Sequence, residues 1–397
     1  MPELATPRTC TGCAACDNIC PHNAITVKPD EEGFLMPEID PGKCVECKLC
    51  EKACPIVNGK DLKHGQKDYV YAFWDNVTRT QSSSGGAFSA VARQIIDRGG
   101  VVYGASWHDN FRLSHVRCTD LQSVAALRGS KYLQSAIEYT LRQVRTDLRE
   151  GRPVLFTGTP CQIAGLRSFL LKPYDNLVTI DIVCHGVPSN VMFCNYISKL
   201  KESDRKYHDI TGFQFRKLSR WGFEPAAITK DNKRILVTGV DNLYMEAFNN
   251  ASTFRHCCYQ CRFNGTQRVG DITIADFWGL GRQHTPFRHN ISEGVSLVMT
   301  NTDSGEKLIR DAKDCFIEKR QLEEATKYNH NLVGSSRLPQ NRDGVIDGFN
   351  CPCSSLKEIN DTFHITPSGA AYVIKNIMIK SGLFWTAKSI IDKLRSR

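Results

Sequence analysis

The sequence predicts an α+β protein in which a short cysteine-rich module precedes a mixed α/β body. A pattern of four cysteines occurs twice within the first 54 residues and marks the module. After it, apolar strand-like segments and amphipathic helical segments alternate as far as residue 184, which favours helices layered on a sheet. Three short apolar runs between residues 209 and 238 then indicate antiparallel strands.

The two cysteine runs read "CTGCAACDNICP" and "CVECKLCEKACP". Each has the spacing C-x2-C-x2-C-x3-C-P, the signature of bacterial ferredoxins with two 4Fe-4S clusters, in which the fourth cysteine of one run binds the other cluster. Zinc sites and disulfides are the alternatives, but zinc ligands usually form two C-x2-C pairs separated by a dozen or more residues. The spacing predicts one cluster on Cys10, Cys13, Cys16 and Cys54, and a second on Cys44, Cys47, Cys50 and Cys20.

The 397 residues exceed one ordinary domain, and a polar, glycine-containing linker at 58–68 ends the cysteine-rich module. The predicted regions are 1–60 (two-cluster ferredoxin), 69–150 and 151–325 (two parts of the body) and 326–397 (an irregular tail with a basic amphipathic helix). The predicted body segments are a strand at 69–75, a helix with Ala87, Val91, Ile95 and Ile96 on one face, a strand at 101–107, a helix at 134–150, a strand at 153–158, a helix at 161–171 and a strand at 177–184.

The net charge is +9, and residues 1–60 contain nine Asp/Glu against six Lys/Arg, so the body is basic. A basic body favours an anionic small-molecule substrate or a phosphorylated cofactor. The chain has no dense Lys/Arg run interleaved with aromatic residues, so nucleic acid is not an expected partner.

No apolar run reaches the ~18–20 residues that cross a bilayer, and the first residues lack the apolar region of a secretory signal. We therefore expect a cytoplasmic protein without a transmembrane segment.

A second group of cysteines lies in the body. Cys161 and Cys184 each follow an apolar strand, and Cys257, Cys258 and Cys261 lie together in "HCCYQCRF". The ends of strands are where α/β folds collect ligand-binding groups. The spacing alone leaves three possibilities open: a third cluster, a zinc ion or no metal.

The body contains, in this order, the motifs "SSSGGAFSAVARQIIDRGGVVYGA", "LRGSKYLQS", "VLFTGTPCQIAGL", "DIVCHGVPS", "CCYQCRF" and "DITIADFWG". In this order they resemble the family of coenzyme F420 hydrogenase/dehydrogenase beta subunits, here fused behind a two-cluster ferredoxin. The resemblance implies an iron–sulfur flavoprotein that moves electrons between clusters, FAD and a substrate such as the deazaflavin coenzyme. It also implies that Cys161, Cys184, Cys258 and Cys261 hold a third 4Fe-4S cluster, with Cys257 as an extra thiol.

Two of these motifs supply the expected flavin contacts. A pyrophosphate suits the backbone N–H groups and positive dipole at the start of a helix, and close approach favours glycine; an ordinary serine-capped helix is the alternative. In "RGSKYLQS", Lys131 would stabilise negative charge on a reduced flavin or an anionic substrate, unless it is a solvated surface lysine. His185 is a metal ligand, a proton donor or a hydrogen-bonded loop residue. The candidate cofactor-binding residues are Ser83, Ser84, Gly85, Gly86, Ser130, Lys131 and Gln134, and the candidate catalytic residues are Lys131 and His185.

We therefore expect a flavin- and iron–sulfur-dependent oxidoreductase that transfers electrons between ferredoxin-type clusters, FAD and an unidentified substrate, with coenzyme F420 as one candidate. Its expected partner is a ferredoxin or another redox protein. A non-catalytic electron-transfer subunit of a larger complex and a cluster-bearing sensor or assembly protein remain as alternatives. The basic helix of the tail would pack on its own domain, contact a partner or lie on a membrane. Its apolar positions are Val373, Ile374, Ile377, Met378, Leu383, Phe384, Ala387, Ile390, Ile391 and Leu394.

Overall fold

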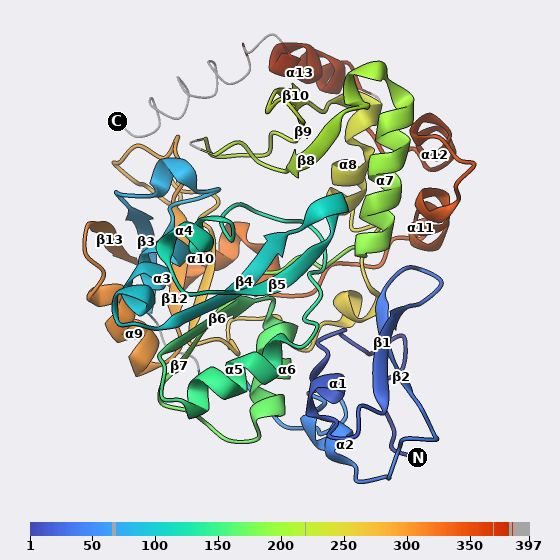
Figure 1. Cartoon of the computed structure of the whole chain (residues 1–397). Helices are drawn as coiled ribbons and strands as arrows, with labels where there is room; N and C mark the ends of the chain where they lie inside the picture. Colours follow the sequence, from blue (N-terminus) through green and yellow to red (C-terminus); the bar gives the residue numbers. More distant parts are fainter. Residues whose placement is uncertain (66–68, 219, 368, 381–382, 384–397) are drawn as a thin grey trace.

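The N-terminal module folds as two similar halves, shown in blue in Figure 1. The computed structural model describes residues 1–65, 69–218, 220–367, 369–380 and 383. The elements of the module are α1 (Ala15–Ile19), β1 (Ile25–Pro29), β2 (Leu35–Ile39) and α2 (Leu49–Ala53). Helices α1 and α2 each follow a residue with positive φ, Ala14 (55°) and Lys48 (58°), while β1 and β2 pair as an antiparallel hairpin between them. The repeated cysteine pattern is therefore matched by a repeated backbone conformation.

An eight-stranded mixed sheet forms the centre of the body. Its strands are β3 (Tyr69–Asp75), β4 (Val101–Trp107), β5 (Leu113–Cys118), β6 (Val154–Gly158), β7 (Leu177–Ile182), β11 (Ile272–Asp276), β12 (Ser296–Thr300) and β13 (Cys315–Arg320). They lie in the order β13-β3-β12-β11-β7-β6-β4-β5. Neighbours among β4, β6, β7 and β11 pair in parallel, whereas the pairs toward both edges are antiparallel. The four strands predicted between residues 69 and 184 are present as β3, β4, β6 and β7, and β5, β12 and β13 are strands for which no prediction was made.

Helices cover both faces of this sheet. They are α3 (Ala87–Asp97), α4 (Leu121–Ala125), α5 (Thr140–Arg149), α6 (Pro160–Leu170) and α9 (Asp303–Arg310). Because successive side chains of a strand point to opposite faces, Val101 and Tyr103 pack with α5 and α6, whereas Val102 packs with α3 and α9. Helix α5 begins later than the predicted residue 134. The preceding chain is held beside β5, where the Ala136 N–H donates to the Leu113 carbonyl at 3.0 Å.

A smaller layer completes the body. Its strands β8 (Ile210–Gln214), β9 (Ala226–Thr229) and β10 (Arg234–Leu236) form an antiparallel sheet, as predicted for 209–238. Helices α7 (Asn190–Ser203) and α8 (Leu243–Asn249) pack against it. An aromatic core that includes Phe193, Tyr196 and Tyr244 joins these elements.

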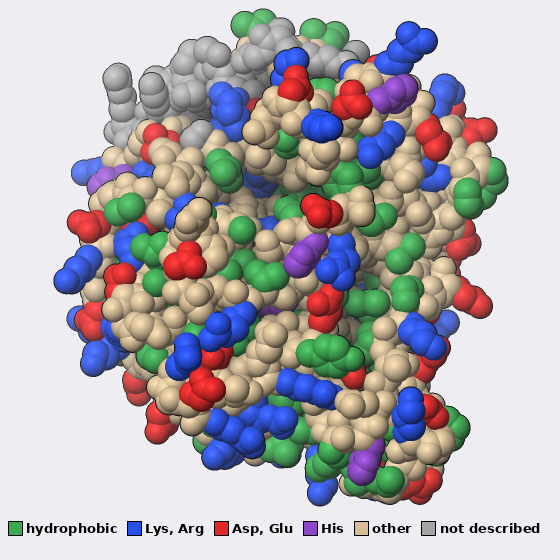
Figure 2. Space-filling model, in the orientation of Figure 1, with side chains coloured by type: hydrophobic (Ala, Val, Ile, Leu, Met, Phe, Trp, Pro, Cys, Tyr) green, Lys and Arg blue, Asp and Glu red, His purple; other side chains and the backbone are tan. Residues whose placement is uncertain are grey.

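The tail is more helical than predicted. It contains α10 (Leu322–Tyr328), α11 (Arg342–Asn350), α12 (Leu356–Phe363) and α13 (Ala370–Lys380). The segment predicted to be irregular includes α11, whose Val345, Ile346 and Phe349 are buried against the aromatic core. The predicted basic helix lies outside the described residues from Phe384 onward. No helix in the described part of the chain is long and apolar enough to cross a membrane. Figure 2 shows Lys and Arg interspersed with Asp and Glu over the visible face.

The N-terminal module is docked on the body beside α5 and α6 (Figure 1). The Arg142 side chain of α5 donates to the carbonyls of Asn18 (2.9 Å), Asp17 (3.0 Å) and Cys20 (3.2 Å), which lie at the end of α1. Apolar residues of the module and of α6 belong to one buried cluster. Arg342 of α11 forms an ion pair with Glu32 of the β1–β2 turn at 2.5 Å. The module is therefore held along its whole length and not only by the linker.

Candidate functional site

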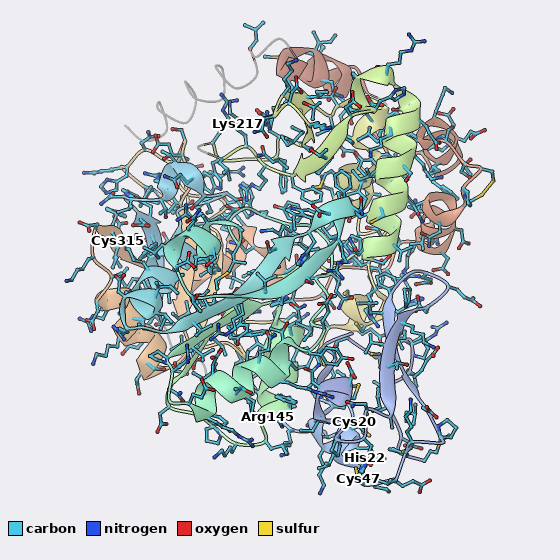
Figure 3. The ribbon with its side chains drawn as sticks, viewed as in Figure 1. Cys20, His22, Cys47, Arg145, Lys217 and Cys315 are labelled. Carbon is cyan, nitrogen blue, oxygen red and sulfur yellow. A yellow bond between two sulfur atoms is a disulfide. The ribbon has the colours of Figure 1, made fainter. Side chains whose placement is uncertain are left out.

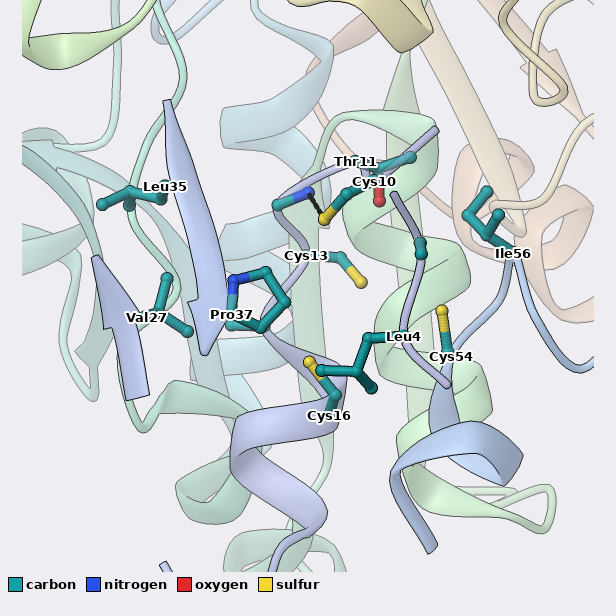
Figure 4. Close-up of a pocket in the computed structure, with 13 residues that line it drawn as sticks. Leu4, Cys10, Thr11, Cys13, Cys16, Val27, Leu35, Pro37, Cys54 and Ile56 are labelled. Carbon is teal, nitrogen blue, oxygen red and sulfur yellow. Dashed lines mark hydrogen bonds between the residues drawn. The ribbon is translucent and has the colours of Figure 1, made fainter. Parts of the chain in front are cut away.

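Four cysteines of the module surround one cavity, which we call the inner site: Cys10, Cys13, Cys16 and Cys54. Figure 4 shows their sulfur atoms directed into a common space. The walls are apolar and include Val27 and Leu35 of the hairpin. Burial raises the pKa of the Cys13 thiol to about 12, with the nearby thiols of Cys54 and Cys10 adding to the shift. Four converging thiols form the donor set of a 4Fe-4S cubane, whose iron would hold them as thiolates. The donor set of the inner site therefore fits that group.

The other four cysteines of the module surround a second cavity, the outer site: Cys20, Cys44, Cys47 and Cys50. The outer site lies closer to the surface than the inner site. Its Cys47 is exposed, whereas Cys10 and Cys13 of the inner site are each only 8% exposed. In Figure 3, Cys20, His22 and Cys47 lie together at the lower end of the molecule. The outer site is therefore the more accessible of the two.

The short helices of the module fix the spacing between these sites. Helix α1 connects Cys16 of the inner site to Cys20 of the outer site, and α2 connects Cys50 to Cys54 in the opposite sense. Residues four apart in a helix are separated by about 6 Å along its axis. The structure thus brings together the two sets of four that the spacing predicted. Backbone N–H groups also approach the sulfurs, with Gly12 N to Cys10 Sγ at 3.4 Å and Ala24 N to Cys20 Sγ at 3.3 Å.

Body cysteines surround a third cavity of about 260 Å³, the body site. Cys161 lies in the first turn of α6 after β6, and Cys184 follows the neighbouring parallel strand β7, so the two strand ends meet. Cys258 and Cys261 come from one short segment that includes the 3₁₀ turn η5 (His256–Gln260). Burial raises the pKa of the Cys161 and Cys184 thiols, and the neighbouring thiols raise it further. These four thiols also form a donor set for a cubane.

Cys257 lines the same cavity as the four expected ligands. A hydrogen bond with the Cys257 thiol is the main cause of the raised pKa of Cys258, and burial adds to it. The body site therefore has five thiols for four positions. The ligand set implied by the resemblance stays a prediction.

The inner site and the body site adjoin. Thr11 and Ile56 line both cavities. Helix α6 links them as well, because it carries Cys161 at the body site and Gly165 one turn later against Cys13. A Cβ atom on Gly165 would lie 2.6 Å from Cys13 Cβ and 2.8 Å from its sulfur. Only glycine permits this approach, and no pattern in the sequence singles out Gly165.

The serine–glycine loop at 82–86 meets the segment "RGSKYLQS" where the Ser130 N–H donates to Ser83 Oγ at 2.8 Å. Ser84 Oγ donates to the Val295 carbonyl at 3.1 Å. The two glycines are buried, and a Cβ on Gly85 would lie 2.1 Å from the Phe73 carbonyl oxygen. Gly86 has a φ of +87°. Packing of this loop against β3 therefore accounts for both glycines without a phosphate.

The other candidate residues lie in three different environments. Lys131 Nζ donates to the carbonyls of Leu127 (3.0 Å), Arg128 (2.9 Å) and Gly129 (3.2 Å), while burial lowers its pKa to about 7. Gln134 is buried at the contact with the module, where its Nε2 donates to the Thr11 carbonyl at 2.8 Å. His185 is exposed and lines the body site. Gln134 therefore belongs to the docking contact, apart from Ser83 and Ser130.

A further group of titratable residues, Glu32, His256 and Asp343, has the spacing of a metal site. The guanidinium of Arg342 occupies its centre: Nη1 lies 2.7 Å from Glu32 Oε1, 2.7 Å from Asp343 Oδ1 and 3.1 Å from His256 Nε2. Arg342 supplies the positive charge that a metal ion would bring. The group is therefore explained as an ion-pair network.

Comparisons with known proteins identify two regions of the chain. Residues 151–325 match the family described as the C terminus of the coenzyme F420 hydrogenase/dehydrogenase beta subunit, and residues 9–57 match the 4Fe-4S dicluster domain. The chain therefore carries the C-terminal region of this family behind a 4Fe-4S dicluster domain. The expected resemblance is confirmed, and so is a 4Fe-4S dicluster domain in front of the family's C-terminal region. With these two regions, the chain is an iron–sulfur electron-transfer protein.

Three known proteins are similar to this chain. The chain is 23% identical over 368 residues to the F subunit of the F(420)H(2) dehydrogenase of Methanosarcina mazei, with 89% of this chain and 95% of the relative covered. It is 23% identical over 317 residues to the coenzyme F420-dependent sulfite reductase of Methanocaldococcus jannaschii, covering 77% of this chain and 46% of that protein. A chain of the F420-reducing NiFe hydrogenase complex from Methanosarcina barkeri is 14% identical with a TM-score of 0.48, covering 72% of this chain and 94% of that one.

Proposed function

We propose that the chain is an oxidoreductase that transfers electrons between a redox protein at the outer site and a substrate of the deazaflavin class at the body, with FAD as an additional cofactor. The serial arrangement of the three cysteine-lined sites carries this proposal. The exposed thiol of Cys47 marks the outer end, and the inner site shares Thr11 and Ile56 with the body site.

The residues at each site suit a different part of this task. Bound 4Fe-4S clusters exchange single electrons. Exposure at the outer site permits a redox protein to come close to its cysteines. The apolar wall of the inner site, including Leu35 and Ile56, excludes water and keeps Cys10 and Cys13 buried. The body site is open at a mouth lined by the exposed side chains of Arg8 and Arg262, which favour an anionic substrate.

Two observations support a substrate of the deazaflavin class and a flavin. Both curated relatives described above carry coenzyme F420 in their names. Within the chain, the contact between Ser83 and Ser130 joins the two motifs that the resemblance assigns to the flavin. Next to them, Lys131 has a pKa of about 7, so its amine can hold or release a proton near neutral pH. His185, at the mouth of the body site, is a second group that can exchange protons with a bound substrate.

Anaerobic purification of the whole chain tests this proposal. We expect about twelve irons per chain, three cubanes of four, and one FAD released on denaturation. Adding the reduced deazaflavin coenzyme should bleach the visible cluster absorption. If dithionite bleaches this absorption but the reduced coenzyme does not, and no flavin is released, the chain relays electrons without binding that substrate.

A further inference from the structure

Arg255 is a buried cation without a carboxylate partner in the part of the chain that the structure describes. Its side chain is 1% exposed. Nε donates to the Cys10 carbonyl (2.7 Å), Nη1 to Gln134 Oε1 (3.0 Å) and Nη2 to the Leu35 carbonyl (2.8 Å), while the guanidinium lies 5.3 Å from the centre of the Phe34 ring. All of these partners are neutral. Burying a cation without a countercharge is costly, so Arg255 requires negative charge from another source.

Two other arginines show what this fold usually does with a buried guanidinium. Arg268 and Arg342 are each 1% exposed, as Arg255 is. Arg268 forms an ion pair with Asp181 at 3.0 Å, and Arg342 forms one with Glu32 at 2.5 Å. Arg255 differs from both in the neutrality of its partners and in its position.

The position of Arg255 is between the inner site and the body site. Its side chain contacts the loop that carries Cys10, and a Cβ on Gly12 would lie only 2.7 Å from its Nη1. Its own backbone carbonyl accepts a hydrogen bond from Cys258 N–H at 2.9 Å. Four thiolates around a cubane make each of these sites negative. None of the hydrogen bonds of Arg255 described above reaches a residue that lines the outer site.

We infer that Arg255 is the countercharge of the inner site. Its positive charge stabilises the reduced, more negative state of a cluster at the inner site more than that of a cluster at the outer site. Arg255 is a positioning residue, because it acts through charge and through the Cys10 loop without contributing a ligand. The inference rests on the proposed function, since it requires clusters at the cysteine sites. Buried cations act strongly because the low dielectric of the interior screens them little.

Potentiometric titration of the whole, iron-loaded chain with dithionite, followed by electron paramagnetic resonance, tests this role. A Cys16→Ser variant identifies the signal of the inner site. In Arg255→Gln, we expect the one-electron reduction constant of the inner site to fall at least tenfold, which is about 59 mV toward more negative potential. The outer site should keep its potential. Arg255→Lys keeps the positive charge but loses the planar guanidinium. Its inner site should therefore have a reduction potential closer to that of the parent protein than the inner site of Arg255→Gln has.

Arg342→Gln is the matched control, because Arg342 is equally buried but already paired with Glu32. It should leave both potentials of the module unchanged. If Arg255→Gln loses the iron of the inner site while Arg255→Lys retains it, the inner site requires a positive charge at residue 255, as inferred. If both variants lose that iron, or if the potential of the inner site does not move, Arg255 only holds the loop and the inference is wrong. A parent protein without iron at the inner site would instead overturn the proposed function.

Discussion

Gly165 allows helix α6, which carries Cys161 of the body site, to lie directly against Cys13 of the inner site. A Cβ there would lie 2.8 Å from the Cys13 sulfur, so Gly165→Ala should displace this thiol. We expect the iron content of the anaerobically purified variant to fall by about four per chain, one cubane. Gly334→Ala is the control, because a Cβ at that position meets no atom within 4 Å. Full iron content in Gly165→Ala would mean that the module tolerates a shift of Cys13.

Lys131 should titrate near neutral pH, because burial lowers its pKa to about 7 whereas an exposed lysine titrates near ~10.4. Isotopic dimethylation of the lysines and a nuclear magnetic resonance titration would measure it, with Lys131→Arg assigning the signal. The lowered pKa also affects stability. Between about pH 7 and 10, Lys131 is protonated in the unfolded chain but deprotonated in the folded protein. The contribution of Lys131 to the free energy of unfolding should therefore rise with pH in that window. An assigned signal that titrates with the exposed lysines would contradict this prediction.

At the scale of elements, α5 holds the N-terminal module by binding the end of α1. The prediction is that Arg142→Ala makes the amides of α1 exchange faster with deuterated solvent. The carbonyls of Asp17, Asn18 and Cys20 lose their donor, and each lost hydrogen bond costs about 0.5–1.5 kcal/mol. Hydrogen exchange with mass spectrometry measures the change. The control is Arg145→Ala on the same helix (Figure 3), because the Arg145 guanidinium lies over the Phe169 ring of the body. Equal exchange in both variants would show that apolar packing alone holds the module.

At the scale of the whole molecule, the proposed function requires electrons to leave the ferredoxin module through the body site. Cys161→Ala should lower the iron content from about twelve to about eight per chain. The ferredoxin clusters of this variant should still be reduced by dithionite, but electron transfer from them to flavin should be lost. Cys194→Ala is the control, because Cys194 lies on α7 and its thiol donates to the Asn110 carbonyl at 3.7 Å. If the parent chain holds only about eight irons, the body cysteines are structural.

Much of this architecture is encoded locally and could be predicted. The grouping of the module's cysteines into two sets of four follows from their spacing, because loops and short helices of about five residues place all eight thiols. The meeting of Cys161 and Cys184 follows from two parallel strands whose ends share one edge of the sheet. In contrast, the late start of α5 depends on pairing with β5, and the roles of Gly165 and Arg255 depend on residues more than a hundred positions away. No local pattern carries such information, which is why these features emerged only from the structure.

The three sites are buried to different extents, which determines the order in which oxygen would damage them. The inner site has three buried cysteines, whereas the outer site presents the exposed Cys47 and the body site opens at its mouth. Oxygen and chelators therefore reach the two ends of the chain of sites before they reach its middle. If the three sites hold clusters as proposed, a partly oxidised molecule keeps the iron of the inner site after it has lost the iron of the two sites that exchange electrons with the donor and the acceptor. Iron content alone would then overstate how much of an aged preparation still works.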